Sequence, residues 1–391
     1  RVAMTPANVA VLCDRGCQVL IQSGAGEAAD FTDIAYRDAG AEILHDRDEI
    51  FARAQIITQV NVASVGDGDH NSHLRRGQIV IGMMDPLGNP ELARSLADRE
   101  ITGIAMELIP RISRAQSMDV LSSMATIAGY KAVVMAANSA TRIYPMMMTA
   151  AGNLNPARVF IMGAGVAGLQ AAATAKRMGA VVEAYDVRPA AREQILSVGA
   201  KPIELALEAE ATEGQGGYAK AQGEAFLARQ RELMAEVLAE QDIVITTAAI
   251  PGAKSPVLIT QAMVEKMRPG AVIVDLASER GGNCELTQHG KTVVEHGVTI
   301  LGPDNVPATV PHHASQMYGN NIENLLAHLI DESGNLNLDF DDEILQETVM
   351  SHMGVVCQAR IRGLLNLPPL SNLLETNPSE TNPCEAIEEV A

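Results

Sequence analysis

The stretch "RVFIMGAGVAGLQAAATAKRMGAVVEAYDVRP" (residues 158–189) decides the fold of much of this 391-residue chain. A short apolar run leads into Gly163, Gly165 and Gly168, which are spaced as G-x-G-x-x-G, and an Ala-rich helical segment follows. A second strand-like run then ends in Asp186, about twenty residues after the glycines. This strand–turn–helix–strand order predicts a dinucleotide-binding βαβ unit, whereas the glycine pattern alone would be weak evidence.

The three glycines and the aspartate each have a physical task in such a unit. Gly163 allows the tight turn, Gly165 lets a pyrophosphate approach the backbone, and Gly168 lets the helix pack closely on the strand. The helix N-terminus presents N–H groups and a positive dipole end to the phosphates. A carboxylate at Asp186 suits the ribose hydroxyls and repels a 2′-phosphate, which favours NAD(H) over NADP(H). Arg188 either weakens that preference or packs over the adenine, and the whole motif has the alternative of packing helix on strand without a ligand.

Further strand-like runs, "DIVITTAAI", "AVIVDLA" and "VTILG", follow the motif, with helical patterns between them. Three loops beside these runs, residues 246–252, 275–283 and 302–308, fall where a sheet of this kind binds its ligand, although ordinary turn chemistry is the alternative for each. The segment "EGQGGY" (213–218) is either a lid over the cofactor or an exposed loop with one tyrosine. We expect the cofactor to be bound by Gly163, Gly165, Val166, Gly168, Asp186, Val187, Arg188, Asp275 and Leu276.

The first third of the chain alternates strand-like and helix-like segments in the same way. Its strand-like runs are "QVLIQSGAG", "AEILH", "AQIITQV", "QIVIGMM" and "ITGIAMEL". Alternating β and α elements predict parallel sheets covered by helices on both faces. The Pro- and Gly-containing "YPMMMTAAGNLNPA" indicates a crossing between domains, and a helix-like segment after Pro311 returns the chain. We therefore expect two Rossmann-like α/β domains with a cleft between them: residues 1–125 plus 312–365, and residues 126–311, followed by a flexible tail over 366–391.

The composition narrows the class of protein. A formal net charge of −19 argues against nucleic acid and anionic membrane surfaces as direct ligands. The five cysteines lack paired metal-ligand spacing, and His70 and His73 lie in a polar loop without a third ligand beside them, so we expect a reduced compartment and no metal site. No secretory signal or membrane span is recognised. Because the chain begins with Arg1 and enters a helix-like segment almost at once, we expect a preceding strand to be missing.

A second candidate site is "RISRAQSMDVLSS" (residues 111–123), directly after the apolar "ITGIAMELIP". It holds two arginines, a glutamine, an aspartate and four serines, but no His, Cys, Lys or Tyr that could move a proton or attack a carbon. The alternative to a site is a capped helix start, with Ser117 or Asp119 as the cap and Arg111 and Arg114 solvated.

Several motifs together resemble a known family. "RVAMTP", "SGAG", "NPEL", "RISRAQSMD", "GAGVAGLQA", "GGYAK" and "GGNCEL" are similar to the peripheral NAD(H)-binding component, or domain I, of the alpha subunit of proton-translocating NAD(P) transhydrogenase. The resemblance extends to about residue 365, and alanine dehydrogenase is the sister family. It implies that Arg111, Gln116, Asp119 and Ser122 hold the nicotinamide, that Asp186 binds the ribose, and that Tyr218 closes a mobile loop.

The resemblance also explains the lack of acid and base groups in the second site. Hydride transfer between two nicotinamides needs aligned rings and exclusion of water, and it changes no hydroxyl or amine. The implied enzyme is a Re/Si-specific, proton-translocating NAD(P) transhydrogenase, with NAD(H) on this chain and NADP(H) on a partner. The implied assembly is a homodimer bound to an NADP(H)-binding beta subunit and a membrane-embedded subunit, cytoplasmic and peripheral on the inner face of the membrane.

Two alternatives remain open from the sequence. Arg1 matches the carboxylate-binding arginine of alanine dehydrogenase, but the position of that family's catalytic histidine, counted from "NPEL", falls on Asp85, and residues 61–77 hold no lysine. An anion there is ill suited to an anionic keto acid. The other alternative is an NAD-binding regulatory or structural module that transfers no hydride.

Overall fold

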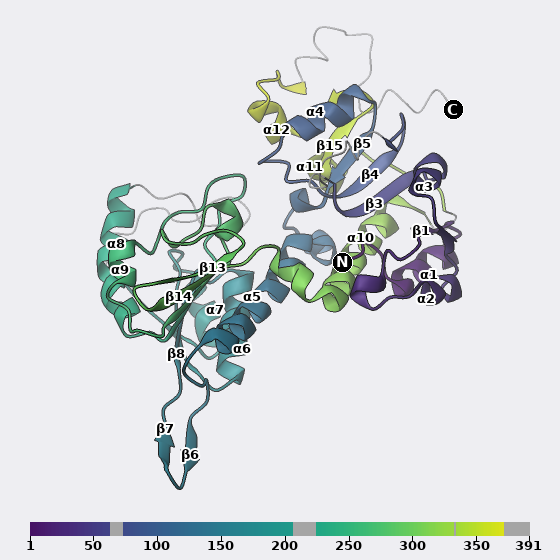
Figure 1. The fold of residues 1–391 in the computed structure, drawn as a ribbon. Helices are drawn as coiled ribbons and strands as arrows, with labels where there is room; N and C mark the ends of the chain where they lie inside the picture. Colours follow the sequence, from purple (N-terminus) through teal and green to yellow (C-terminus); the bar gives the residue numbers. More distant parts are fainter. Residues whose placement is uncertain (63–72, 206–223, 332–333, 371–391) are drawn as a thin grey trace. The chain divides into compact units, whose positions relative to one another are not determined.

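The computed structural model describes residues 1–62, 73–205, 224–331 and 334–370 (Figure 1). The chain divides into two compact units. Unit 1 comprises Arg1–Met124 and Pro311–Ala391, and unit 2 comprises Ala125–Val310. Unit 2 is thus inserted in the sequence of unit 1, and the chain passes between them twice.

Unit 2 is built on a seven-stranded sheet in the order β10-β9-β8-β11-β12-β14-β13. All neighbours are parallel except the edge pair β13–β14. The chain order therefore reverses between β8 and β11, which is the point where doubly wound sheets bind ligands beyond the carboxyl ends of their strands. The strands are β8 (Arg158–Met162), β9 (Val181–Tyr185), β10 (Lys201–Pro202), β11 (Ile243–Thr246), β12 (Val272–Asp275), β13 (Lys291–Glu295) and β14 (Val298–Gly302).

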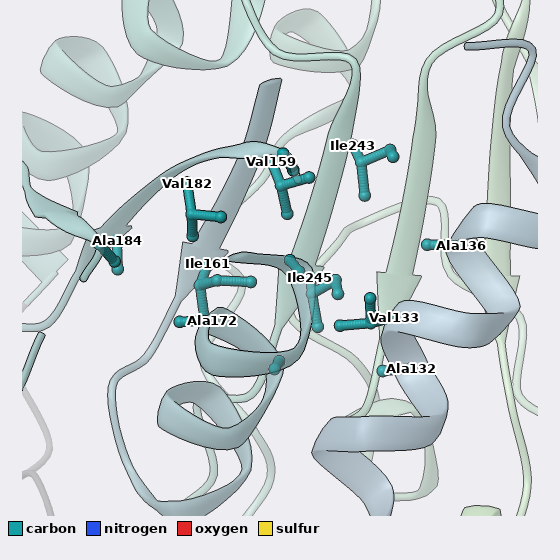
Figure 2. Packing of buried hydrophobic residues seen from close by; sticks show 14 of the residues in the cluster. Ala132, Val133, Ala136, Val159, Ile161, Ala172, Val182, Ala184, Ile243 and Ile245 are labelled. Carbon is teal, nitrogen blue, oxygen red and sulfur yellow. The ribbon is translucent and has the colours of Figure 1, made fainter. Parts of the chain in front are cut away.

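Alternate residues of these strands face two separate cores, because side chains alternate across a sheet. Figure 2 shows one core, in which Val159 and Ile161 of β8 meet Ile243 and Ile245 of β11 beside Ala172. Helices α5 (Val120–Ser139), α6 (Val166–Arg177) and α7 (Ala191–Ser197) contribute to this core. The other core contains the intervening strand residues and side chains from α8 (Glu224–Ala239) and α9 (Gln261–Val264). The parallel sheet is buried on both faces, as its apolar runs predict.

Within the described part of the chain, helix α5 is the one helix long and apolar enough to cross a membrane. Its Ala132, Val133 and Ala136 are buried in the unit 2 core. A Cβ on Gly129 would lie 2.1 Å from the carbonyl oxygen of Ala167 in α6, so the two helices touch backbone to backbone. This packing places one face of α5 in a protein core.

A hairpin of β6 (Met147–Thr149) and β7 (Gly152–Leu154) projects from unit 2 (Figure 1). Every residue of both strands is exposed, and Met148 keeps 73% of its surface in contact with solvent. No charged residue occurs between Arg142 and Arg158. The segment predicted to cross between domains therefore forms an uncharged, Met-rich projection.

Unit 1 contains a five-stranded sheet in the order β16-β15-β5-β4-β3, together with a separate parallel pair, β1–β2. Strands β3, β4 and β5 are parallel, whereas β15 and β16, from the returning chain, are antiparallel additions. The five strand-like runs of the first third thus lie in two sheets. The strands are β1 (Leu20–Gln22), β2 (Glu42–Leu44), β3 (Ile56–Asn61), β4 (Ile79–Met83), β5 (Thr102–Ala105), β15 (Val349–His352) and β16 (Val355–Val356).

The helices of unit 1 bury an apolar core of their own. Phe51, Leu96 and Ile361, from three different helices, share one core with Val80 of β4 and Met350 of β15. The long helix α10 also contacts the sheet, because the Tyr318 hydroxyl donates a 2.7 Å hydrogen bond to the carbonyl oxygen of Gln59 in β3. The helices are α1 (Pro6–Asp14), α2 (Asp33–Asp38), α3 (Arg47–Arg53), α4 (Glu91–Asp98), α10 (Pro311–Leu329), α11 (Glu343–Thr348) and α12 (Ala359–Leu364).

Candidate functional site

The glycine motif forms the turn between β8 and α6, and its three glycines have different surroundings. Gly163 has φ +101°, and its carbonyl oxygen accepts a 2.9 Å hydrogen bond from the Thr247 hydroxyl. A Cβ on Gly168 would lie 1.8 Å from that same carbonyl oxygen. A Cβ on Gly165 would have nothing within 4 Å. Gly163 and Gly168 are therefore required by the turn itself, whereas Gly165 leaves open space at the start of a helix.

The open space at Gly165 lies where a helix presents unbonded N–H groups. Gly165 is the N-cap residue of the 12-residue α6 and has no side chain to cap it. The first N–H groups of a helix have no partner within the helix, and they favour an anionic ligand. Val166, predicted to contact the cofactor, is the first residue of α6 and is 39% exposed. The turn therefore fits a dinucleotide pyrophosphate.

Asp186 follows β9 and ties the second strand to the glycine turn. One carboxylate oxygen, Oδ2, accepts a 2.7 Å hydrogen bond from the Ala164 N–H. The Arg188 guanidinium binds both carboxylate oxygens at 2.9 Å, and the Arg188 N–H donates to Oδ1 at 2.9 Å. These four donors match the roughly four lone-pair sites of a carboxylate. A ribose hydroxyl would consequently have to replace a donor from Arg188, and Val187 between the two is half-buried.

Asp275, at the end of β12, is fully buried and organises a second part of the same sheet edge. Its carboxylate accepts hydrogen bonds from five protein donors: Thr246 Oγ1, Ala277 N, Asn283 N, Cys284 N and Thr287 Oγ1. The contact of Asp275 with the cofactor stays a prediction, and within the protein its carboxylate is wholly engaged by these donors. The whole of Asp275 is buried, whereas the neighbouring Leu276 is half-buried.

Asn283 joins two of the loops that were predicted to lie near the nucleotide. Its amide Nδ2 donates to the carbonyl oxygens of Ala248 and Pro256 at 2.8 and 2.9 Å, and its Oδ1 accepts from the Ala248 N–H at 3.0 Å. The loop over 302–308 is joined as well, because the Asn305 N–H donates to Glu279 at 2.8 Å. Hydrogen bonds between the loops thus fix the edge of the sheet near β11 and β12.

The second candidate site, residues 111–123, lies in unit 1. It forms a 3-10 helix over Ser113–Met118 that leads into α5. Asp119 accepts hydrogen bonds from the N–H and the hydroxyl of Ser122 at 2.9 and 2.6 Å, so the predicted helix cap is present. Arg111 and Gln116 are exposed, as a ligand-holding role requires, while Ala115 is fully buried and anchors the segment.

Arg114 departs from the solvated role considered above. It forms a two-pronged ion pair with Asp342, which lies at the start of α11. The predicted nicotinamide residues Arg111, Gln116, Asp119 and Ser122 are thus gathered on one segment of unit 1, and the predicted dinucleotide residues on unit 2. Tyr218 and its glycine-rich segment lie outside the described residues.

Asp85, on which the count from "NPEL" places the histidine of the sister family, has φ +48° and lies beside a buried carboxylate. Its N–H and that of Met84 donate to Glu107 Oε1 at 2.8 and 2.7 Å. Burial raises the pKa of Glu107. Oε2 of the same carboxylate has no hydrogen-bond partner among the described residues. Two acidic groups therefore occupy this position.

Sequence reasoning missed the residues that hold the sites in place. These residues bind partners that lie well apart from them in the sequence, and the residues around them give no sign of those partners. They are Asn283, Thr287, Asn321 and Asp342. The "GGN" of residues 281–283 gives one signal, because Gly281 and Gly282 both have positive φ and precede the buried Asn283. Two consecutive glycines before an asparagine are typical of a sharp turn that presents a side chain inward.

The family models "Alanine dehydrogenase/PNT, N-terminal domain" and "Alanine dehydrogenase/PNT, C-terminal domain" match residues 1–128 and 132–359. The chain is 45% identical over 367 residues to an NAD(P) transhydrogenase subunit alpha protein of Rhodospirillum rubrum, and the match covers 93% of this chain and 96% of that one. It is 29% identical over 319 residues to alanine dehydrogenase of Bacillus subtilis, covering 80% and 77% of the two chains.

A solved structure described as transhydrogenase from Sinorhizobium meliloti superimposes with a TM-score of 0.80 and 44% identity, covering 91% of this chain and 96% of that one. An L-alanine dehydrogenase structure has a TM-score of 0.77 at 23% identity, which shows a shared fold. The predicted α/β class and the resemblance to the transhydrogenase alpha subunit are confirmed. The chain belongs to the alanine dehydrogenase/PNT family.

Proposed function

We propose that this chain is the NAD(H)-binding component of a Re/Si-specific, proton-translocating NAD(P) transhydrogenase and that it passes hydride between NADH and NADP+ held on a partner subunit. The observation that carries the proposal is the open space at Gly165 beside the N-terminus of α6, because it suits a pyrophosphate and the other two motif glycines are packed. The 45% identity to a transhydrogenase subunit alpha supports the choice of reaction.

The residues have separate tasks in this function. The turn around Gly165 binds the pyrophosphate, and Asp186 with Arg188 receives the adenosine ribose. Arg111, Gln116, Asp119 and Ser122 orient the nicotinamide ring, which supplies the hydride when bound. Amide, carboxylate and guanidinium groups fix a ring without exchanging protons, as a transfer between two nicotinamides requires. Closure by Tyr218 would exclude water, and this role stays a prediction.

The assembly belongs to the proposal as well. A homodimer is supported by the β6–β7 hairpin, because an uncharged, Met-rich projection is a surface at which two chains of net charge −19 can meet without direct charge repulsion. An NADP(H)-binding beta subunit and a membrane-embedded subunit would complete the enzyme. The chain would then be cytoplasmic and peripheral on the inner face of the membrane.

Alanine dehydrogenase activity is the second candidate because that family shares the fold and a 29% identical sequence. Asp85 and the buried Glu107 argue against it. Reductive amination of a keto acid needs a cation for the substrate carboxylate and a proton-transfer group, and two adjacent acids supply neither the charge nor a base suited to that anion.

The test is a rapid-mixing experiment with the NADP(H)-binding component of a related transhydrogenase. Hydride transfer from NADPH to an NAD+ analogue is followed, with pyruvate plus ammonium as a parallel reaction. The proposal expects a fast burst that needs both proteins. NADH binding without a burst would favour a module that binds and does not transfer, and turnover with pyruvate and ammonium alone would favour alanine dehydrogenase.

A further inference from the structure

The segment Arg111–Asp119 has little of its own to hold it in place. Its regular part is one short 3-10 helix, and only Ala115 and Met118 of the segment are buried. Gln116, which the proposed function places against the nicotinamide, is exposed. A transfer reaction loses rate when the reacting groups are misplaced by about 1 Å, so the segment needs support from outside.

Asp342 gives that support from a part of the chain more than two hundred residues away. Arg114 Nη1 lies 2.7 Å from Asp342 Oδ2, and Nη2 lies 2.7 Å from Oδ1, which is the paired geometry of a strong charge-assisted contact. The Asp342 side chain is 11% exposed and that of Arg114 is 50% exposed, so the carboxylate is held in the protein while the guanidinium reaches it from the surface.

Two further contacts fix Asp342 itself. Its Oδ1 accepts a 2.7 Å hydrogen bond from the Ile344 N–H, which makes Asp342 the N-cap of α11. His328 Nε2 of α10 lies 3.0 Å from Oδ2. The Arg114 hydrogen bond is the largest cause of a pKa of Asp342 below its usual value, so the carboxylate is charged at neutral pH. The anchor is therefore a rigid anion between two helices.

A second residue, Asn321, holds the segment at Ser117. The buried Asn321 of α10 donates a 2.8 Å hydrogen bond from Nδ2 to the carbonyl oxygen of Ser117. Gln116 thus lies between two tethered positions, Arg114 and Ser117. Both tethers come from the part of unit 1 that follows unit 2 in the sequence.

We propose that Asp342 is a positioning residue for hydride transfer: by holding Arg114 it fixes the segment from Arg111 to Asp119 and, through it, the Gln116 side chain. The inference rests on the proposed function for the role of Gln116. The inference assigns a task to the part of unit 1 that begins at Pro311, which contributes none of the predicted contacts to the cofactor.

The test combines hydrogen–deuterium exchange with transfer kinetics on the full chain. Asp342→Asn removes the negative charge but keeps Oδ1, which caps α11. It replaces Oδ2 by an NH2 group, a donor that faces Arg114 Nη1 and His328. Arg114→Ala removes the tether and leaves the cap in place. Glu42→Gln is the matched control, because Glu42 forms a two-pronged pair with Arg53 in the same unit and has no link to the segment.

We expect amides of residues 113–119 to exchange about tenfold faster or more in both tether variants, the change that a loss of about 1.4 kcal/mol of local stability gives. The transfer rate should fall about tenfold or more. The dissociation constant for NADH should stay within about twofold, since the proposed pyrophosphate and ribose contacts are on unit 2 and neither tether residue is among them. Glu42→Gln should leave all three quantities unchanged.

Gln116→Ala separates the failure of this inference from that of the proposed function. If it slows transfer while both tether variants keep the wild-type exchange and transfer rates, the positioning role is wrong and the function stands. If Gln116→Ala transfers hydride at the wild-type rate, the assigned ring contact is wrong. Unchanged exchange over 113–119 in both tether variants would overturn the inference whatever the kinetics show.

Discussion

At the scale of single residues, the glycine motif offers a comparison between two alanine substitutions. Gly168→Ala places a Cβ 1.8 Å from a backbone carbonyl oxygen, so we expect it to destabilise unit 2 by about 3 kcal/mol. Gly165→Ala meets nothing within 4 Å and has an ordinary φ of −78°, so its stability should be unchanged. Urea unfolding measures both effects.

The same pair of variants tests the cofactor site. A methyl group at residue 165 fills the space assigned to the pyrophosphate, so the affinity of Gly165→Ala for NADH should fall about tenfold or more, equivalent to about 1.4 kcal/mol. Fluorescence titration with NADH measures this. A stable Gly165→Ala protein with wild-type affinity would contradict the placement of the pyrophosphate.

His352 predicts a pH dependence of stability. Burial lowers the pKa of this histidine below its usual value, and Thr102 Oγ1 and the Phe340 ring contact it. The unfolded chain therefore binds a proton at a pH where the folded chain does not. Stability from this group is present above about pH 6.5 and declines as the pH falls below it, by at most about 1.4 kcal/mol per pH unit.

Urea midpoints measured from pH 7.5 to pH 5.5 check this expectation. His352→Asn lacks the titrating group and should show a flatter profile than the wild type over that range. Parallel profiles for the two proteins would mean that His352 titrates alike in the folded and unfolded chains.

Single residues also show how far the sequence alone could reach. The roles of Gly163 and Gly168 follow from local geometry, and the structure shows both constraints. Asp275 is the last residue of a strand, a position typical of an acid that binds a ligand. Five protein donors nevertheless bind its carboxylate. Those donors fold back from as far as Thr287, and no local pattern predicts that.

At the scale of elements, the loops beside β11 and β12 depend on one asparagine. Asn283→Ala would leave two carbonyl oxygens and one N–H group of half-buried residues without this partner, so we expect a loss of about 1–3 kcal/mol. The affinity for NADH should also fall because loops 246–252 and 275–283 lose the hydrogen bonds between Asn283 and Ala248. Thermal unfolding and NADH titration test the two effects.

Asn324→Ala is the control for this change. The Asn324 amide makes one hydrogen bond, to the Asn320 carbonyl oxygen, at an exposed position, so its loss should cost less than about 0.5 kcal/mol. Equal losses in the two variants would show that the loop network adds nothing beyond a single hydrogen bond.

The sequence patterns predicted none of the three antiparallel hairpins, β6–β7, β13–β14 and β15–β16. The pairs β13–β14 and β15–β16 are joined by two-residue turns, His296-Gly297 and Met353-Gly354, in which both residues have positive φ. Such turns are typical of tight hairpins and favour glycine at the second place. The first turn residues are not the usual Asn or Asp, and the strands of the second hairpin are too short for a clear alternation.

The two long-range features of unit 1 were harder to predict. Strand β15 joins the sheet beside β5, and the pair β1–β2 forms a sheet of its own. The short runs of β-branched residues predicted β1, β2 and β5 in the first third of the chain. Which strands pair is decided by packing between distant segments, and no local pattern shows it. For the first third of the chain the element types were accessible from the sequence, whereas the sheet order was not.

At the scale of the whole molecule, the proposed homodimer gives a direct prediction. Met147→Glu combined with Met148→Glu places two charges on the exposed β6–β7 hairpin. Each buried methionine side chain is worth about 1.5–3 kcal/mol, so the dimer dissociation constant should rise by about two orders of magnitude or more. Analytical ultracentrifugation measures the monomer fraction.

Val294→Glu is the control. Val294 is 65% exposed and lies on β13, which belongs to the seven-stranded sheet and not to the β6–β7 hairpin. It should keep the wild-type association state, and all three proteins should bind NADH. A wild-type protein that sediments as a monomer at every concentration would refute the homodimer, and a hairpin variant that stays dimeric would place the contact elsewhere.

The insertion of unit 2 within unit 1 has a consequence for biosynthesis. Strand β5 leaves the ribosome with β4 as one neighbour, but its other neighbour, β15, follows only after the whole of unit 2. At about 5–20 residues per second, the wait lasts roughly ten to fifty seconds. A nascent chain that stops between Val310 and Val349 therefore carries a finished dinucleotide unit and an open β edge, which is the kind of edge that aggregates or recruits a chaperone.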